Sequence, residues 1–215
     1  MNFPLQDSSD LKGISSFLDL ADNLGIIHRN ISEGPIKRVE INCYGTLDQI
    51  KPISLSFLRS LLQNRVPERV NFINAETIAK ELGIELYINY STSDSNYSNL
   101  ISARVVAKND IIFEGSVFND DLPRLVNLMG YKMEVNLKGT LLFIQNEDVP
   151  GVVGKVGTIL GKNKINIGAY LLSQHSKEKL AFAVIRLDSP IDETLISELK
   201  DIEELKFVNQ IQIDS

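Results

Sequence analysis

The stretch Asn146–Leu160, NEDVPGVVGKVGTIL, together with Lys164–Gly168, KINIG, decides the fold of the last part of the chain. Pro150 suits the first turn of a helix, because proline lacks the N–H that would be unpaired there. Gly151 allows a ligand or a neighbouring backbone to approach closely. The apolar residues that follow predict a helix over 151–163, and the Ile-Asn-Ile sequence predicts that a strand comes next.

The residues around this stretch predict a small domain from Thr140 to Ser215. This domain has the βαββαβ order of the ferredoxin-like fold, a four-stranded antiparallel sheet with two helices on one face. We interpret Phe207–Ile213 and Ala181–Leu187 as outer strands, whose exposed edges are expected to pair with a second chain. The predicted elements are Thr140–Gln145, Gly151–Asn163, Asn166–Ser173, Ala181–Leu187, Glu193–Leu199 and Phe207–Ile213.

The start of the predicted helix is a candidate site for a small zwitterion. The helix dipole and the unpaired backbone N–H groups of Val152 and Val153 favour a carboxylate. Asp148 can accept a hydrogen bond from an ammonium group, and Asn166 can both donate and accept.

Structural roles for the same residues remain open. Asp148 can cap the helix, and Asn166 can be a turn residue. Gly154 and Gly157 can form a small surface for close helix packing. Each of these roles has to be weighed against ligand binding.

The order of strand, Asp-x-Pro-Gly, apolar helix and Ile-Asn-Ile resembles an ACT domain, and ACT domains bind amino acids. The resemblance implies that Asn166 contacts a ligand held by the partner chain. The implied effector-binding residues are Asp148, Pro150, Gly151, Val152, Val153 and Asn166.

The preceding part of the chain, residues 34–138, is predicted to be an α+β domain with a largely antiparallel sheet. Its expected elements are a strand over Ile36–Leu47, helices over Pro52–Leu62 and Ala75–Leu82, strands over Glu85–Ser91, Leu100–Lys108 and Ile111–Phe118, and two short strands within Arg124–Asn136. Residues 1–33 are predicted to be a short extended lead and an amphipathic helix, with Gly25 as a candidate break. Lys138-Gly139 is the expected boundary to the last domain, 139–215.

Four segments, Gly34–Val39, Val70–Ala75, Ala79–Ile84 and Gly115–Phe118, are similar to the intervening domain of long-form D-3-phosphoglycerate dehydrogenases. Asn2-Phe3-Pro4 is similar to the segment by which those enzymes leave their catalytic region. The resemblance implies a regulatory half, in which an allosteric substrate-binding domain precedes an ACT domain that senses L-serine. It also implies a cytoplasmic homo-oligomer, dimer or tetramer, in which NAD belongs to the catalytic half.

The same resemblance implies a site for a phosphate- or carboxylate-bearing ligand in the middle domain. Arg124, Lys132 and Lys138 are the basic candidates for it. Acidic residues follow Phe118 where a glycine-rich turn is usual, at Asn119-Asp120-Asp121, and they weaken anion binding. The alternative is that the lysines are solvated surface residues.

Composition excludes several classes of function. Lys and Arg number 22 against 28 Asp and Glu, for a net charge of −6, which argues against nucleic acid or an anionic membrane as partner. No apolar stretch approaches the roughly 20 residues of a membrane span. A G-x-G-x-x-G fingerprint does not occur, and no catalytic or metal-binding cluster is predicted.

The residues most often used in catalysis have structural interpretations here. We expect His28 and His175 to be surface residues and Cys43, the single cysteine, to be an inert part of a strand. One cysteine also indicates the cytoplasm. The competing interpretations are a stand-alone ACT regulatory protein and the regulatory domain of another amino-acid enzyme. Iron–sulfur serine dehydratase is one such enzyme, but its cluster requires several cysteines.

Overall fold

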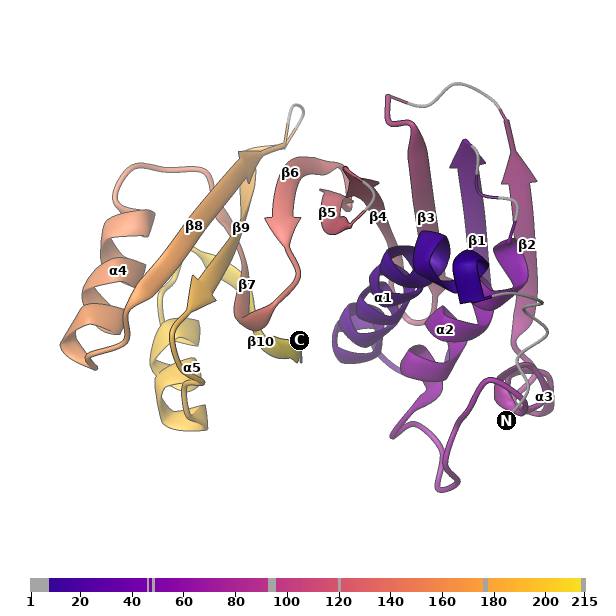
Figure 1. Ribbon diagram of the computed structural model, residues 1–215. Helices are drawn as coiled ribbons and strands as arrows, with labels where there is room; N and C mark the ends of the chain where they lie inside the picture. The colour runs from indigo at the N-terminus through magenta and orange to yellow at the C-terminus, as the bar shows by residue number, and fades with distance from the viewer. Residues whose placement is uncertain are drawn as a thin grey trace. The chain divides into compact units, whose positions relative to one another are not determined.

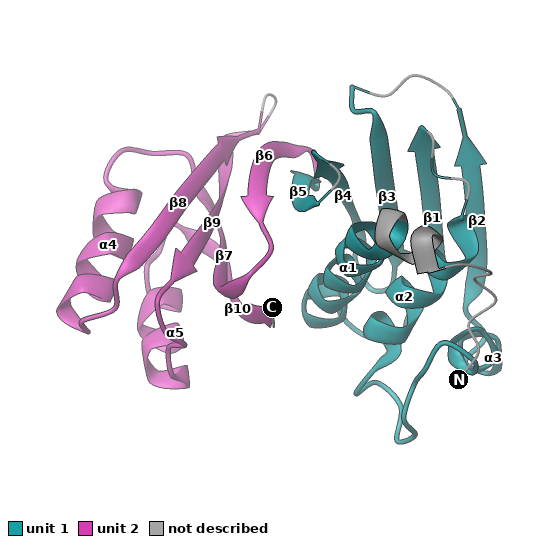
Figure 2. Cartoon of the chain, viewed as in Figure 1, with its two compact units in different colours: residues 1–129 teal, residues 130–215 magenta. Residues whose placement is uncertain are grey.

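The computed structural model describes residues 8–45, 47, 49–92, 96–119, 121–175 and 178–213 (Figure 1), with side chains from residue 14 onward. The predictions for Asn2-Phe3-Pro4 and Asp120 lie outside the described residues. The chain forms two compact units, residues 1–129 and 130–215 (Figure 2), and each is described by itself. The strand at 131–136, predicted for the middle domain, is grouped with the second unit.

In the first unit, helices cover one face of a mixed sheet (Figure 1). The strand order within this unit is β2-β1-β3-β4-β5. β1 pairs parallel with β2, whereas the pairs β1–β3, β3–β4 and β4–β5 are antiparallel, as expected. The elements are α1 (Ser8–Ile31), β1 (Arg38–Gly45), α2 (Ile50–Leu62), α3 (Ala75–Glu81), β2 (Glu85–Ser91), β3 (Asn99–Val106), β4 (Asp110–Phe118) and β5 (Leu122–Leu128).

Helix α1 is continuous across Gly25, so the predicted break is wrong. The glycine serves the packing of α1 against α2: a Cβ built on Gly25 would lie 2.5 Å from the carbonyl oxygen of Phe57. Close approach of two backbones needs a residue without a side chain. The signal that suggested a break therefore marks a helix–helix contact.

His28 is fully buried, so the prediction of a surface residue is wrong. Its Nε2 lies 3.1 Å from the carbonyl oxygen of Ala103, and its ring packs against Phe57 and Phe113 at centroid distances of 5.6 and 4.4 Å. Helix α1 contacts both α2 and the sheet, so its buried face is wide and includes the position one turn after Leu24. Burial lowers the pKa of the imidazole to about 3, so the ring is neutral at pH 7.

The second unit contains the expected ferredoxin-like domain, preceded by one further strand. Its sheet has the order β10-β7-β9-β8 with antiparallel neighbours. The outer strands are therefore β10 and β8, and the prediction that Ala181–Leu187 is an outer strand is wrong. The elements are β6 (Tyr131–Asn136), β7 (Gly139–Glu147), α4 (Val152–Lys162), β8 (Ile167–Gln174), β9 (Leu180–Leu187), α5 (Glu193–Lys200) and β10 (Leu205–Ile213).

Both faces of the second sheet carry buried side chains. Leu142 and Ile144 of β7 belong to the core formed with α4 and α5. Residues of the opposite parity, including Phe143 and Phe182, face the other side and are also fully buried. Strand β6 contacts β8 and β9, and the ring of its Tyr131 lies 5.5 Å from that of Phe182. β6 thus contributes to covering the face that the helices leave open.

Candidate functional site

The candidate site is the loop between β7 and α4, where Gly151 is the N-cap of the helix. Gly151 has φ of +98°, a conformation that favours glycine. Pro150 precedes the cap instead of lying in the first helical turn as predicted, and the helix begins at Val152. A Cβ on Gly151 would have no neighbour within 4 Å, so the space beside the loop is open.

The first helical N–H groups of α4 are available to a ligand. The amide of Lys155 donates to the carbonyl of Gly151 at 3.0 Å, which is the first hydrogen bond of the helical pattern. The amides of Val152, Val153 and Gly154 precede it and have no acceptor within the helix. Together with the helix dipole they make this end of α4 a favourable position for a carboxylate.

Asp148 lies three residues before the N-cap of α4, on an anchored backbone. Its N–H donates to the carbonyl of Lys179 at 3.0 Å, and its side chain is exposed. The residue that caps α4 is Gly151, without a side-chain hydrogen bond, so the structure does not give Asp148 the role of cap. Its carboxylate can therefore accept from an ammonium group of a ligand.

Other charged residues near the loop are paired with each other. Lys206 Nζ lies 2.7 Å from Glu147 Oε1, and Lys155 pairs with Glu204. The hydrogen bond from Lys155 holds the pKa of the Glu204 carboxyl below its usual value. These two pairs involve neither Asp148 nor the helix amides.

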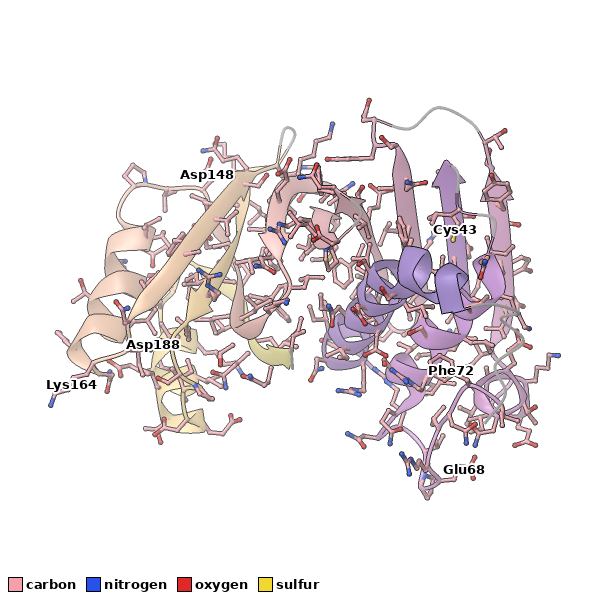
Figure 3. All side chains as sticks on the ribbon, in the orientation of Figure 1. Cys43, Glu68, Phe72, Asp148, Lys164 and Asp188 are labelled. Carbon is pink, nitrogen blue, oxygen red and sulfur yellow. The ribbon has the colours of Figure 1, made fainter. Side chains whose placement is uncertain are left out.

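Asn166 lies at the other end of α4. Eleven residues of helix separate it from Gly151, which corresponds to about 16 Å. Figure 3 shows Asp148 on the loop that leads into α4, and Lys164 and Asp188 toward the other end of the helix. The Asn166 backbone is tied to Asp188, with N–H to Oδ1 and carbonyl to N–H distances of 3.2 Å each. One chain therefore brings together Asp148 and residues 150–153, but not Asn166.

Among the described residues, nothing lies where a side chain of Gly154 or Gly157 in α4 would begin. A Cβ on Gly154 or Gly157 would meet nothing within 4 Å. Close packing, the structural alternative for these two residues, is therefore not seen within the part of the chain that the structure describes.

The basic candidates of the middle domain are divided between the two units. Arg124, in β5 of the first unit, is half-buried and donates from Nη1 to the carbonyl of Pro123 at 3.1 Å. Lys132 and Lys138 belong to the second unit and are exposed. A role for these three residues in an anion site stays a prediction.

Cys43 is fully buried, as predicted, and burial raises the pKa of its thiol to about 12. The described residues include no group of three or more Cys, His, Asp and Glu side chains placed to hold a metal ion. Within the same residues, no helix has the length and apolarity needed to cross a membrane.

Residues 13–129, more than half of the chain, match the family of the D-3-phosphoglycerate dehydrogenase intervening domain. The chain belongs to this family. Residues 140–204 match the ACT domain family. The resemblance stated from the sequence is therefore confirmed for the intervening domain and for the ACT domain. The fold class predicted from the sequence, α+β followed by a ferredoxin-like domain, is also confirmed.

Curated relatives of the chain are named D-3-phosphoglycerate dehydrogenase. The chain is 27% identical over 216 residues to D-3-phosphoglycerate dehydrogenase of Bacillus subtilis and 28% identical over 218 residues to that of Methanocaldococcus jannaschii. Each alignment covers 99% of this chain and 41% of the relative. The chain thus spans about two fifths of the length of the curated relatives it matches.

Among solved structures, the ACT domain of GTP pyrophosphokinase from Chlorobium tepidum matches 34% of this chain and 97% of its own, at 17% identity and a TM-score of 0.29.

Sequence reasoning missed one polar residue at the site. Asn146 is 4% exposed and is the next-to-last residue of β7, the strand that leads into the loop. The alternation of β7 contains the signal, because Leu142, Ile144 and Asn146 share one face of the strand.

Proposed function

We propose that the chain is the regulatory portion of a cytoplasmic D-3-phosphoglycerate dehydrogenase of serine biosynthesis, and that its ACT domain binds a small amino acid, L-serine. One observation carries the proposal: the first amides of α4 have no acceptor within the helix, and the exposed Asp148 lies three residues before its N-cap, in a chain whose relatives are phosphoglycerate dehydrogenases. Catalysis and NAD binding belong, in this proposal, to parts of the enzyme outside this chain. The chain alone transfers no hydride.

The chemistry of the loop suits a zwitterion. The carboxylate of the amino acid lies against the N–H groups of Val152 and Val153, and its ammonium group faces Asp148. A small side chain suits the open space beside Gly151.

Two copies of the chain complete the site. Gln174 at the end of β8 pairs with Ala181, which pairs with Asn146, so the end of β8 lies level with the candidate loop. Antiparallel pairing of two β8 edges places the start of one strand opposite the end of the other. The partner's Asn166 then comes to the loop of the first chain.

Apolar exposure supports the same assembly. The exposed large apolar side chains of the described second unit are Val149, Val153 and Leu172, at 44, 47 and 43%. All three belong to the loop, α4 or β8, which form the proposed contact, and an unpaired edge strand is usually covered in a native protein.

We expect the chain to form at least a dimer in solution, because β8 is an unpaired edge and the site needs residues from both chains. Light scattering of the purified chain at micromolar concentration measures the mass. Replacing Leu172 with lysine should shift the population to monomers, since a buried unpaired charge opposes association. A strictly monomeric mass of the unmodified chain would refute the two-chain site.

Replacing Asp148 with alanine should weaken L-serine binding at least ~10-fold, because a charge-assisted hydrogen bond contributes about 1.5–3 kcal/mol. Asn166→Ala should have a similar effect through the partner chain. Asn163→Ala is the matched control: its side chain donates to the carbonyl of Ile159 at the C-terminal end of α4 and is expected to leave affinity unchanged. Calorimetry measures all three, and an Asp148→Ala protein that binds L-serine like the wild type would contradict the proposed geometry.

A further inference from the structure

Strand β2 is the terminal strand of the sheet in the first unit (Figure 1). Its one neighbour among the described residues is β1, and the pairing runs without a register shift from Glu85 to Ser91. The other side of β2 therefore has a row of backbone groups that face away from the sheet. Native proteins usually protect such an edge with a lysine, a proline or a bulge. β2 has the sequence ELYINYS and contains none of these devices.

The hydrogen bonds to β1 show which backbone groups of β2 face outward. The N–H of Glu85 donates to the carbonyl of Lys37 at 2.9 Å, so the backbone groups of Glu85 point toward β1. Successive residues of a strand point their N–H and C=O groups to opposite sides. The groups of Leu86, Ile88 and Tyr90 consequently face away from β1, and they form what we call the free edge.

Side chains on both faces of β2 are also partly uncovered. All seven residues of the strand are at least partly exposed, whereas β1 contains the buried residues Val39, Ile41 and Cys43. Tyr87 and Tyr90, on opposite faces of β2, are 48 and 41% exposed. Outward backbone groups together with exposed aromatic side chains suit the addition of a further strand.

The strand has no unpaired charge that would oppose such an addition. Its one charged residue is Glu85, whose Oε2 lies 2.9 Å from Nε of Arg38 on β1. The same guanidinium lies 5.5 Å from the centre of the Tyr87 ring. A charged partner strand is therefore not required, and two copies of β2 do not repel each other.

We propose that the free edge binds the free edge of a second copy of this chain, as an antiparallel pair centred on Ile88. Ile88 then lies opposite its own copy, and Leu86 lies opposite the partner's Tyr90. Each of these outward-facing pairs exchanges two backbone hydrogen bonds, about six in total. Glu85 lies opposite the partner's Ser91, so no like charges face each other. This register uses the full length of the strand.

This contact is separate from the pairing of β8 edges and does not depend on the proposed ligand site. β2 belongs to the first unit and β8 to the second. One seven-residue strand buries less surface than a stable dimer interface, so the contact is weak. We expect a dissociation constant of about 100 μM, so that the contact forms at high protein concentration.

The test uses the full chain with Leu172→Lys, which removes the β8 contact, and measures its mass by sedimentation. We expect a monomer at about 5 μM and mostly dimer at about 500 μM. Adding Ile88→Pro should keep the chain monomeric at both concentrations. The N–H that proline lacks faces the free edge, so the hydrogen bonds to β1 stay. Ile88→Ala, which retains the N–H, is the matched control and should still form the dimer.

Amide hydrogen exchange locates the contact without any substitution in β2. In the Leu172→Lys protein, the N–H groups of Leu86, Ile88 and Tyr90 should exchange about fourfold more slowly at the higher concentration. The reason is that only about a quarter of the chains are then monomeric. The N–H groups of Tyr87 and Asn89 point toward β1, so they should be protected at both concentrations and serve as the internal reference.

Four results would overturn the proposal. They are a monomer at both concentrations, a dimer whose free-edge amides exchange as fast as in the monomer, a dimer that persists with Ile88→Pro, and free-edge amides already protected at the lower concentration. The last result would mean that the edge is covered within one chain. If Ile88→Pro does not fold, the exchange pattern of the Leu172→Lys protein decides.

Discussion

Replacing Tyr131 with alanine is expected to lower the free energy of unfolding of the second unit by about 3–5 kcal/mol. Tyr131 is 2% exposed and is the first residue of β6, the strand that contacts β8 and β9. Its ring lies 5.4 Å from that of His175 and 5.5 Å from that of Phe182, and its hydroxyl accepts from Gln145 Nε2 at 3.3 Å. The truncation leaves a cavity against the sheet and an unpaired amide.

Urea denaturation measures this loss, and amide hydrogen exchange of β9 assigns it to the second unit. Tyr131→Phe is the matched control: it keeps the ring and removes one hydrogen bond, so it should cost only about 1 kcal/mol. A Tyr131→Ala protein as stable as the wild type would mean that β6 does not belong to the core of this unit.

Lowering the pH from 6.5 toward 3 should destabilise the first unit through His28. The pKa of this buried imidazole is about 3 in the folded state and about 6.5 in an unfolded chain, so only the unfolded state binds the proton in between. The stability present above pH 6.5 is therefore lost as the pH falls, by roughly 1.4 kcal/mol per pH unit. At pH 4.5 the free energy of unfolding is therefore lower by about 2.7 kcal/mol because of His28.

The measurement is urea denaturation of the wild type and of His28→Leu between pH 7 and 4.5. Carboxylates also titrate in this range, so the difference in slope between the two proteins isolates the histidine. Leu61→Ala, a substitution at a fully buried position of α2, is the control that lowers stability without removing a titrating group. Parallel pH profiles for wild type and His28→Leu would contradict a neutral buried histidine.

Local signals were sufficient to predict most elements, because each is marked near its own ends. The helix predicted over Pro52–Leu62 is an example, since the structure has α2 over Ile50–Leu62. The βαββαβ order was predicted in the same way, since turn residues and the change of hydrophobic period separate its elements.

Features that depend on distant parts of the chain were not predictable from the same signals. The place of Ala181–Leu187 inside the sheet follows from strand pairing. The alternation of apolar and polar residues within one strand carries no information about which strands pair. His28 was misjudged because the width of the buried face of α1 depends on two packing partners. At the site, the sequence predicted Asp148 and residues 150–153 as a group, but that Asn166 lies about 16 Å away follows only from the length and direction of α4.

Calorimetric titration of the purified chain with L-serine tests whether the ACT domain binds an amino acid, with the other common amino acids as a comparison panel. The account predicts saturable binding of L-serine with a dissociation constant below the millimolar range and weaker or no binding of large amino acids. Millimolar or absent affinity for every amino acid would contradict it, and would leave the loop between β7 and α4 as a structural turn without a ligand.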